Sequence, residues 1–227
     1  MMIVLEKRSA QSQAMIWLSP VVALGITVVI GGLIFAGLGV DPIKALYIYF
    51  VEPLTSLWSI EELFVKAAPL ILIGTGLAVC YTANVWNIGA EGQLTIGALF
   101  GSAIPIYFTA WQSPMVLILM LLLGVLGGAL FGAIPALLKS RFGVNEILTS
   151  LMLVYVAQLL LDWVIRGPWK DPKGFNFPQS VSFEGWQLLP LLGEGRVHIG
   201  VIFALVAALL LWMMTVSYTH LTLPTKA

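Results

Sequence analysis

Charged side chains are scarce in this sequence of 227 residues. Lys, Arg, Asp and Glu make up 10% of it, against about 25% in soluble domains, while apolar residues reach 59%. The mean hydropathy is +0.99. This composition excludes a disordered chain and a soluble domain. Neither sign dominates, because 11 basic residues balance 11 acidic ones, so nothing favours nucleic-acid binding.

Cysteine and catalytic motifs are also lacking. The lone Cys80 excludes an internal disulfide, and no Cys/His cluster indicates a metal site. There is no G-x-x-x-x-G-K-[ST] motif for ATP phosphates. No Ser/His/Asp grouping, HExxH motif or carboxylate pair at a useful spacing indicates a hydrolase. We therefore expect a membrane protein that is not an enzyme and holds no cofactor or metal.

Long uncharged runs are what the sequence has instead, at 9–40, 67–90, 92–138, 147–161 and 197–225. About 20 apolar residues suffice for one helical crossing of a bilayer. The third run is long enough for two crossings, with a turn signal at 111–114. The runs do not alternate as barrel strands do. We predict an all-α polytopic membrane bundle of about six transmembrane helices, at 16–40, 63–83, 87–108, 115–138, 147–166 and 197–216.

The loops set an expected orientation. A basic pair at 7–8 precedes the first span and, by the positive-inside rule, places the N-terminus in the cytoplasm. Counting crossings puts the basic loop at 139–146 on the same side. The acidic loop at 41–62 and the longer loop at 167–196 then lie outside. Turn signals and tryptophans predict that the longer loop is a folded cap, with a docking surface for an extracytoplasmic partner as the alternative.

Residues 84–93 form the densest polar stretch inside the apolar runs. Asn87, Glu91 and Gln93 offer amide and carboxylate groups there, and two glycines permit departures from helix. A carboxylate at mid-membrane costs about 2.5–3.5 kcal/mol on insertion scales. Irregular backbone at that depth must be buried in protein or line a cavity. The stretch is either a cytoplasmic turn, with Glu91 solvated or at a helix N-terminus, or a broken segment that lines a path for a polar solute.

A second polar stretch, at 139–146, predicts a short cytoplasmic loop. Asn145 is the expected N-cap of the next helix, and Glu146 in the first turn favours the helix dipole. Contact with a cytoplasmic subunit is the functional alternative. Further along, Gln158 and Asp162 are spaced to bond to each other on one helix face.

Small residues recur at four-residue spacing on two predicted helices. The pattern comprises Gly97, Gly101, Gly124, Gly128 and Gly132. Such residues let helix backbones approach closely in lipid, where no hydrophobic effect drives helices together. We predict packing between helices of this chain, with a contact between subunits as the alternative.

Two stretches carry a family resemblance. Residues 87–93, Asn-Ile-Gly-Ala-Glu-Gly-Gln, and residues 143–153, Gly-Val-Asn-Glu-Ile-Leu-Thr-Ser-Leu-Met-Leu, resemble permease subunits of bacterial ABC importers. The superfamily is that of branched-chain amino acid and simple-sugar permeases. Residues 166–180 are similar to its nucleoside and simple-sugar branch. The resemblance covers about residues 10–216.

The resemblance implies a multi-pass permease subunit in the bacterial plasma (inner) membrane. It implies a second permease subunit, identical or different, cytoplasmic ATP-binding subunits that hydrolyse ATP, and an extracytoplasmic solute-binding protein. The implied solute is a nucleoside or a simple sugar. Asn87, Glu91 and Gln93 are expected to line or shape the substrate pathway, and Asn145 and Glu146 to shape the cytoplasmic side. An ion-coupled secondary transporter and a non-transporting scaffold remain alternatives.

The end of the sequence departs from the family pattern. Members of the family continue with further helices and a segment that couples to the ATPase. We therefore expect an incomplete transmembrane permease domain at 1–216 and a non-native tail at 217–227, where the composition changes abruptly. A genuine short polar terminus is the alternative.

Overall fold

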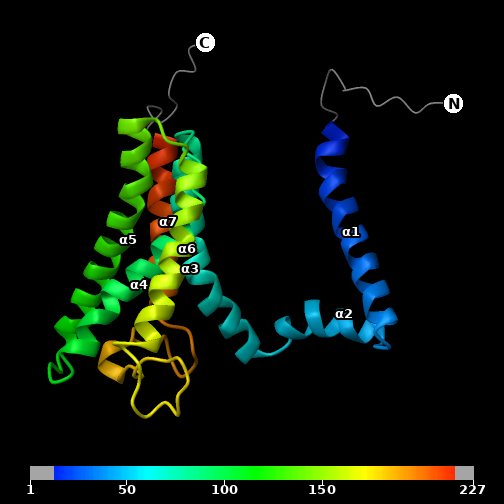
Figure 1. Ribbon diagram of the computed structural model, residues 1–227. Coiled ribbons are helices and arrows are strands. Elements are labelled where there is room, and N and C mark those ends of the chain that lie inside the picture. The colour runs from blue at the N-terminus through cyan, green and yellow to red at the C-terminus, as the bar shows by residue number, and fades with distance from the viewer. Residues whose placement is uncertain (1–12, 218–227) are drawn as a thin grey trace. The chain divides into compact units, whose positions relative to one another are not determined.

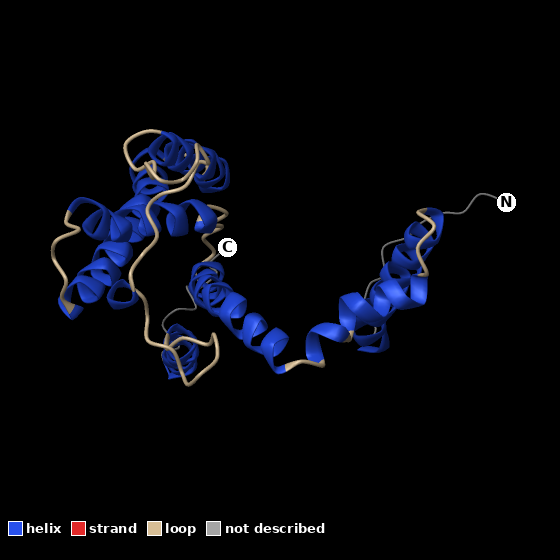
Figure 2. Cartoon of the chain, turned by 90° about the horizontal axis from the view of Figure 1, so that it is seen from below, coloured by secondary structure: helices blue, strands red, loops and turns tan. Residues whose placement is uncertain are grey.

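A computed structural model describes residues 13–217, and all regular secondary structure within them is helical (Figures 1 and 2). The predicted all-α class is confirmed, and each of the six predicted ranges overlaps one helix. The predicted tail at 217–227 lies outside the described residues except for Ser217. The elements are α1 (Gln13–Gly37), α2 (Pro42–Phe50), η1 (Glu52–Leu54), α3 (Leu57–Thr82), α4 (Ala90–Tyr107), α5 (Pro114–Phe142), α6 (Glu146–Arg166), η2 (Gly185–Gln187) and α7 (Gly200–Ser217).

Four described helices are long and apolar enough to cross a bilayer: α1, α3, α5 and α6. Two others that we predicted to cross fall short of that standard. In α4, Glu91 and Gln93 make the first turn polar. In α7, the apolar stretch Gly200–Val216 reaches the end of the described residues before it attains that length. The orientation of the N-terminus stays a prediction.

The sequence reasoning missed α2, which lies in the predicted 41–62 loop. Asp41 caps this helix, since its Oδ1 accepts the N–H groups of Ile43 at 2.9 Å and Lys44 at 3.3 Å. Pro42 holds the first helical position, where its missing N–H needs no partner. An Asp-Pro pair before apolar residues is the signal that identifies such a helix.

The chain divides into two compact units, Met1–Leu63 and Phe64–Ala227. In the first, α1 packs on α2, where Gly32 faces Leu46 and Pro42. The second contains α4 to α7 and most of α3. Every residue that we singled out as a functional candidate belongs to this second unit.

Within the second unit, α4 and α6 share an apolar core. The core comprises Ile96, Leu99, Ala157 and Val164, with Phe131, Leu161 and Trp169 packed around it. The start of α4 contacts the middle of α6, and the two helices run in the same direction. A smaller cluster of Ala68, Val201 and Ala204 joins α3 to α7. This arrangement fixes the N-terminus of α4 beside α6.

Residues 167–199, between α6 and α7, are folded as predicted. The Trp169 ring meets the Tyr107 ring edge-on, with centroids 6.1 Å apart. The Asp171 N–H donates to the Gln179 carbonyl at 2.9 Å. An isolated antiparallel bridge pairs Leu191 with His198. The location of this segment outside the membrane stays a prediction.

Candidate functional site

The polar segment singled out in the sequence interrupts the helices between α3 and α4. Asn84 adopts a left-handed backbone conformation (φ 56°), and the chain stays irregular up to Gly89. As a result α4 begins at Ala90, later than the predicted start at residue 87. Asn87 Oδ1 accepts the Gly89 N–H at 2.9 Å, which fixes the backbone just before the helix.

Asn87 and Gln93 form a reciprocal amide pair across the start of α4. Asn87 Nδ2 donates to Gln93 Oε1, and Gln93 Nε2 donates to Asn87 Oδ1, both at 3.3 Å. Both side chains are half-buried. The pair places hydrogen-bonding groups among apolar helices without burying a charge. The structure thus brings together two of the three residues that we assigned to the pathway.

Glu91, the third, lies on the side of α4 that faces α6. Its Oε1 accepts a hydrogen bond from Gln158 Nε2 at 2.9 Å, and both side chains are exposed. Gln158 lies about 18 Å along the axis from the start of α6, so this polar pair sits near the middle of a helix long enough to span. The expected bond between Gln158 and Asp162 is not formed. Asp162 instead accepts from Arg166 Nε at 2.6 Å.

The first turns of α6 hold the irregular segment in place. Ser150 is 1% exposed; its Oγ accepts the Ile88 N–H at 3.2 Å and donates to the Ile147 carbonyl at 3.2 Å. Gly89 packs so closely that a Cβ there would stand 3.0 Å from Ser150 Cβ. Sequence reasoning missed Ser150. The sequence signal for it is its position as a small polar residue five places after Asn145, the N-cap that we identified.

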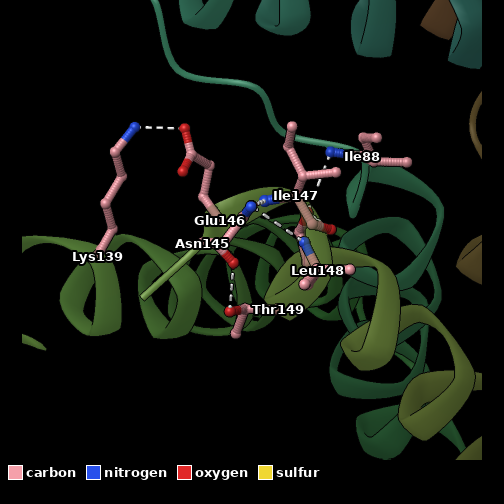
Figure 3. A network of polar contacts seen from close by, with 8 residues as sticks. Ile88, Lys139, Asn145, Glu146, Ile147, Leu148 and Thr149 are labelled. Carbon is pink, nitrogen blue, oxygen red and sulfur yellow. Dashed lines mark hydrogen bonds and ion pairs between the residues drawn. The ribbon is translucent and has the colours of Figure 1, made fainter. Parts of the chain in front are cut away.

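The predicted N-cap of α6 is confirmed. Asn145 Oδ1 accepts the N–H groups of Ile147 at 2.9 Å and Leu148 at 3.5 Å. Glu146 forms an ion pair with Lys139 from the last turn of α5, with side chains 16% and 39% exposed (Figure 3). These contacts close the short loop between α5 and α6. A contact of the loop with another subunit stays a prediction.

The recurring glycines lie where α4 meets α5. A Cβ on Gly97 would stand 2.8 Å from the Gly124 carbonyl oxygen, and one on Gly101 would stand 2.8 Å from the Met120 carbonyl oxygen. Real Cβ atoms essentially never approach an atom so closely. The two backbones therefore touch at these points, and any side chain there would force them apart.

The other two glycines of the pattern, on α5, face Gln93. A Cβ on Gly128 would stand 3.2 Å from the Gln93 carbonyl oxygen, and one on Gly132 would stand 3.1 Å from Gln93 Nε2. These glycines leave room for the Gln93 side chain to reach Asn87. The packing pattern and the amide pair are thus parts of one arrangement.

Two cavities meet at Gln93. The larger, about 890 Å³, lies between α3, α4, α5 and residues 183–198. The smaller, about 570 Å³, continues between the same helices to Asn87 and Cys80. Their shared lining residues are Leu72, Gln93, Leu94, Gly124 and Val125. Of the described residues, no Asp, Glu, Lys or Arg lines either cavity, so Glu91 lies outside both.

Comparison with known proteins identifies the family. Residues 59–219 match the family described as branched-chain amino acid transport system / permease component. The chain belongs to this family. The resemblance stated from residues 87–93 and 143–153 is confirmed, and the permease, with several apolar helices, is a multi-pass membrane protein.

Several curated relatives carry transporter names. The chain is 39% identical over 205 residues to a glucose ABC transporter permease protein of Haloferax volcanii. This match covers 84% of this chain and 53% of the relative. It is 31% identical over 162 residues to a guanosine ABC transporter permease protein of Bacillus subtilis (70% and 46%). It is 26% identical over 214 residues to a nucleoside ABC transporter permease protein of Lactococcus lactis (91% and 58%). The chain spans about half the length of the curated relatives it matches. No solved structure matches it.

Proposed function

We propose that the chain belongs to the permease subunit of an ATP-driven ABC importer and that its solute is a nucleoside or a simple sugar. The observation that carries this proposal is the 39% identity, over 84% of the chain, with a glucose ABC transporter permease protein. The relatives named for guanosine and nucleosides support the same class of solute. The charge-free cavities beside α4 fit it as well.

Asn87 and Gln93 form the inner part of the solute path. They line the smaller cavity, and their mutual bonds are long, at 3.3 Å. A hydroxyl of a passing solute can replace one amide as the partner of the other, because it both donates and accepts. Exchanging bonds of the same kind keeps both amides satisfied while the solute moves.

Glu91 shapes the path from the opposite side of α4. Its bond to Gln158 fixes the start of α4 against α6. We expect Glu91→Gln to keep an acceptor for Gln158 and to import at near wild-type rates, and Glu91→Ala to import several-fold more slowly. Uptake by the full-length variants, normalised to assembled complex, measures this. If Glu91→Gln assembled but lost uptake, the negative charge itself would be required.

The remaining subunits of the proposed importer supply energy and solute. ATP hydrolysis occurs in cytoplasmic ATP-binding subunits, and an extracytoplasmic binding protein delivers the solute to a pair of permease subunits in the plasma membrane. With the N-terminus in the cytoplasm, the loop that contains Asn145 and Glu146 faces the ATP-binding subunits.

Reconstitution tests the proposal. The full-length permease, co-expressed with an ATP-binding subunit, a second permease subunit and a solute-binding protein from the same source, is assayed for uptake of labelled glucose and labelled guanosine. We expect uptake of at least one solute, abolished when the ATPase is inactivated. Uptake that survives this inactivation but collapses with an ionophore at constant ATP would identify an ion-coupled transporter. No uptake, together with no solute-dependent phenotype on deletion, would identify a scaffold.

A further inference from the structure

The larger cavity has the size and the walls of a small-molecule site. Its volume of about 890 Å³ falls within the range of about 300–1,000 Å³ that is common for ligand pockets. Most of its surface is apolar, supplied by leucines of α3, α4 and α5 and by residues 188–191. Ligand pockets typically combine such walls with a few polar groups that orient the ligand. The polar groups here are Gln93, Ser102, Gln187 and His198.

Gln187 is a buried amide in this wall with part of its bonding capacity unused. It is 7% exposed, and its Oε1 accepts the Glu184 N–H at 2.9 Å. Its Nε2 has no hydrogen-bond partner among the described residues, although the residue lines the cavity. The Nε2 donor is therefore free to bond to a ligand in the cavity.

Ser102 and His198 add two more groups at the same cavity. The Ser102 hydroxyl makes no hydrogen bond to another described residue, so it can both donate and accept. His198 Nδ1 accepts the Gly200 N–H at 3.2 Å. With Nδ1 as an acceptor, the ring N–H lies at Nε2, which can donate to a ligand. The cavity thus offers donors from three separate parts of the chain.

The absence of charge in the described lining restricts the ligand. A carboxylate, phosphate or ammonium group would lie against apolar walls here, with no Asp, Glu, Lys or Arg in the described lining as a counter-charge, which is unfavourable. A sugar hydroxyl matches the amide, hydroxyl and imidazole groups, because it donates and accepts. The apolar face of a sugar ring or a base matches the leucine walls.

We propose that this cavity binds the solute on its way to Asn87 and Gln93, and that Gln187 is a specificity-determining residue that selects uncharged, hydroxyl-bearing solutes. The inference rests on the proposed function and adds a binding chamber and a basis for rejecting zwitterionic and phosphorylated solutes. Glucose 6-phosphate and guanosine monophosphate are excluded on this basis.

The first test changes the donor and keeps the fold. Gln187→Glu retains an oxygen for the Glu184 N–H and replaces the free Nε2 donor with an acceptor. In the full-length complex we expect at least a ten-fold loss of glucose or guanosine uptake with unchanged assembly. Gln179→Glu is the matched control, since Gln179 is exposed in the same segment and lies outside the described cavity linings. It should import within two-fold of wild type.

The second test fills the chamber. Ala98 is exposed and lines the cavity, so the larger side chain of Ala98→Trp reduces the space for a ligand. We expect uptake to be lost in the assembled complex. Ala136→Trp makes the same change at an exposed position of α5 outside the described linings and should leave uptake intact. Import at wild-type rates by both Ala98→Trp and Gln187→Glu would overturn the proposal.

A binding measurement separates this inference from the proposed function. A single thiol is introduced by Ser102→Cys in a Cys80→Ser background, and its labelling rate with a maleimide is measured in the full-length complex. We expect millimolar glucose or guanosine to slow labelling at least three-fold, and the phosphorylated forms to have no effect. Slowed labelling without uptake would refute the importer and support the chamber. Uptake without protection, or equal protection by phosphorylated forms, would refute the chamber alone, and neither uptake nor protection would refute both.

Discussion

The two sides of α4 use small residues for opposite purposes. Towards α5, Gly97 and Gly101 bring two backbones into contact, with no space left for a Cβ. On the side of the cavity, Ala98 and Ser102 stand one position further along and border a space of about 890 Å³, which Gly97 and Gly101 line as well. One residue along a helix turns the side chain by about 100°. Small residues therefore close one side and open the other, and their spacing alone does not distinguish the two uses.

The largest expected loss of stability comes from placing a large side chain on the side of α4 that packs against α5. Gly101→Leu sets a Cβ 2.8 Å from the Met120 carbonyl oxygen, and no side-chain rotation relieves a clash with backbone. We expect a loss of about 3 kcal/mol or more and little assembled protein. Size-exclusion chromatography of the solubilised full-length protein measures this, with Ala98→Trp as the comparison. Equal recovery of the two variants would remove the distinction between the sides.

A smaller loss of stability is expected where a hydrogen bond holds the segment before α4 against α6. Ser150→Ala removes the hydroxyl that accepts the Ile88 N–H, at a cost of about 0.5–1.5 kcal/mol for the lost hydrogen bond. Thermal unfolding in detergent should shift to lower temperature. Thr149→Ala is the control, since the Thr149 hydroxyl donates only to the Asn145 carbonyl of its own helix. A shift for Thr149→Ala as large as that for Ser150→Ala would contradict the assignment.

The N-cap of α6 supports the same region less directly. Asn145→Ala removes the acceptor for the Ile147 and Leu148 N–H groups and should cost about 1 kcal/mol. Asn145→Asp keeps the acceptor and should restore stability. Both variants are compared by thermal unfolding, and failure of Asn145→Asp to restore stability would argue against a capping role.

The smallest expected change in stability comes from a substitution on the side of α4 that borders the larger cavity. Ser102→Ala removes a hydroxyl that has no partner among the described residues, so stability should change by no more than about 0.5 kcal/mol. The same substitution thus gives a clear loss at Ser150 and almost none at Ser102. A marked loss of stability for Ser102→Ala would show that this side is also closed by a specific contact.

The helical framework was predictable because long uncharged runs leave few alternatives inside a bilayer. The N-cap of α6 was predictable because Asn145 bonds to N–H groups two and three residues away. For α2, the short apolar stretch after Asp41 and Pro42 gives no signal of a membrane span, so it escaped a search for long runs. Patterns within a few residues of sequence thus predicted the structure of those same residues.

The candidate site was only partly predictable, because its contacts are long-range. Asn87 and Gln93 are 6 positions apart, and both stood out as polar residues between apolar runs. Glu91 meets Gln158 across 67 positions, and Ile88 meets Ser150 across 62. No local pattern encodes such pairs. Gln187 lies in a turn-rich segment where a glutamine is unremarkable until the fold places it against a cavity.

The apolar composition of α1 has an evolutionary consequence. No residue of Ala14–Gly37 is charged and most are apolar, so transfer of this helix into lipid is favourable along its whole length. On insertion scales Leu, Ile, Phe and Val each contribute about 0.3–0.6 kcal/mol at mid-membrane, and one substitutes for another at little cost. We therefore expect substitutions that exchange one apolar residue of α1 for another to be tolerated.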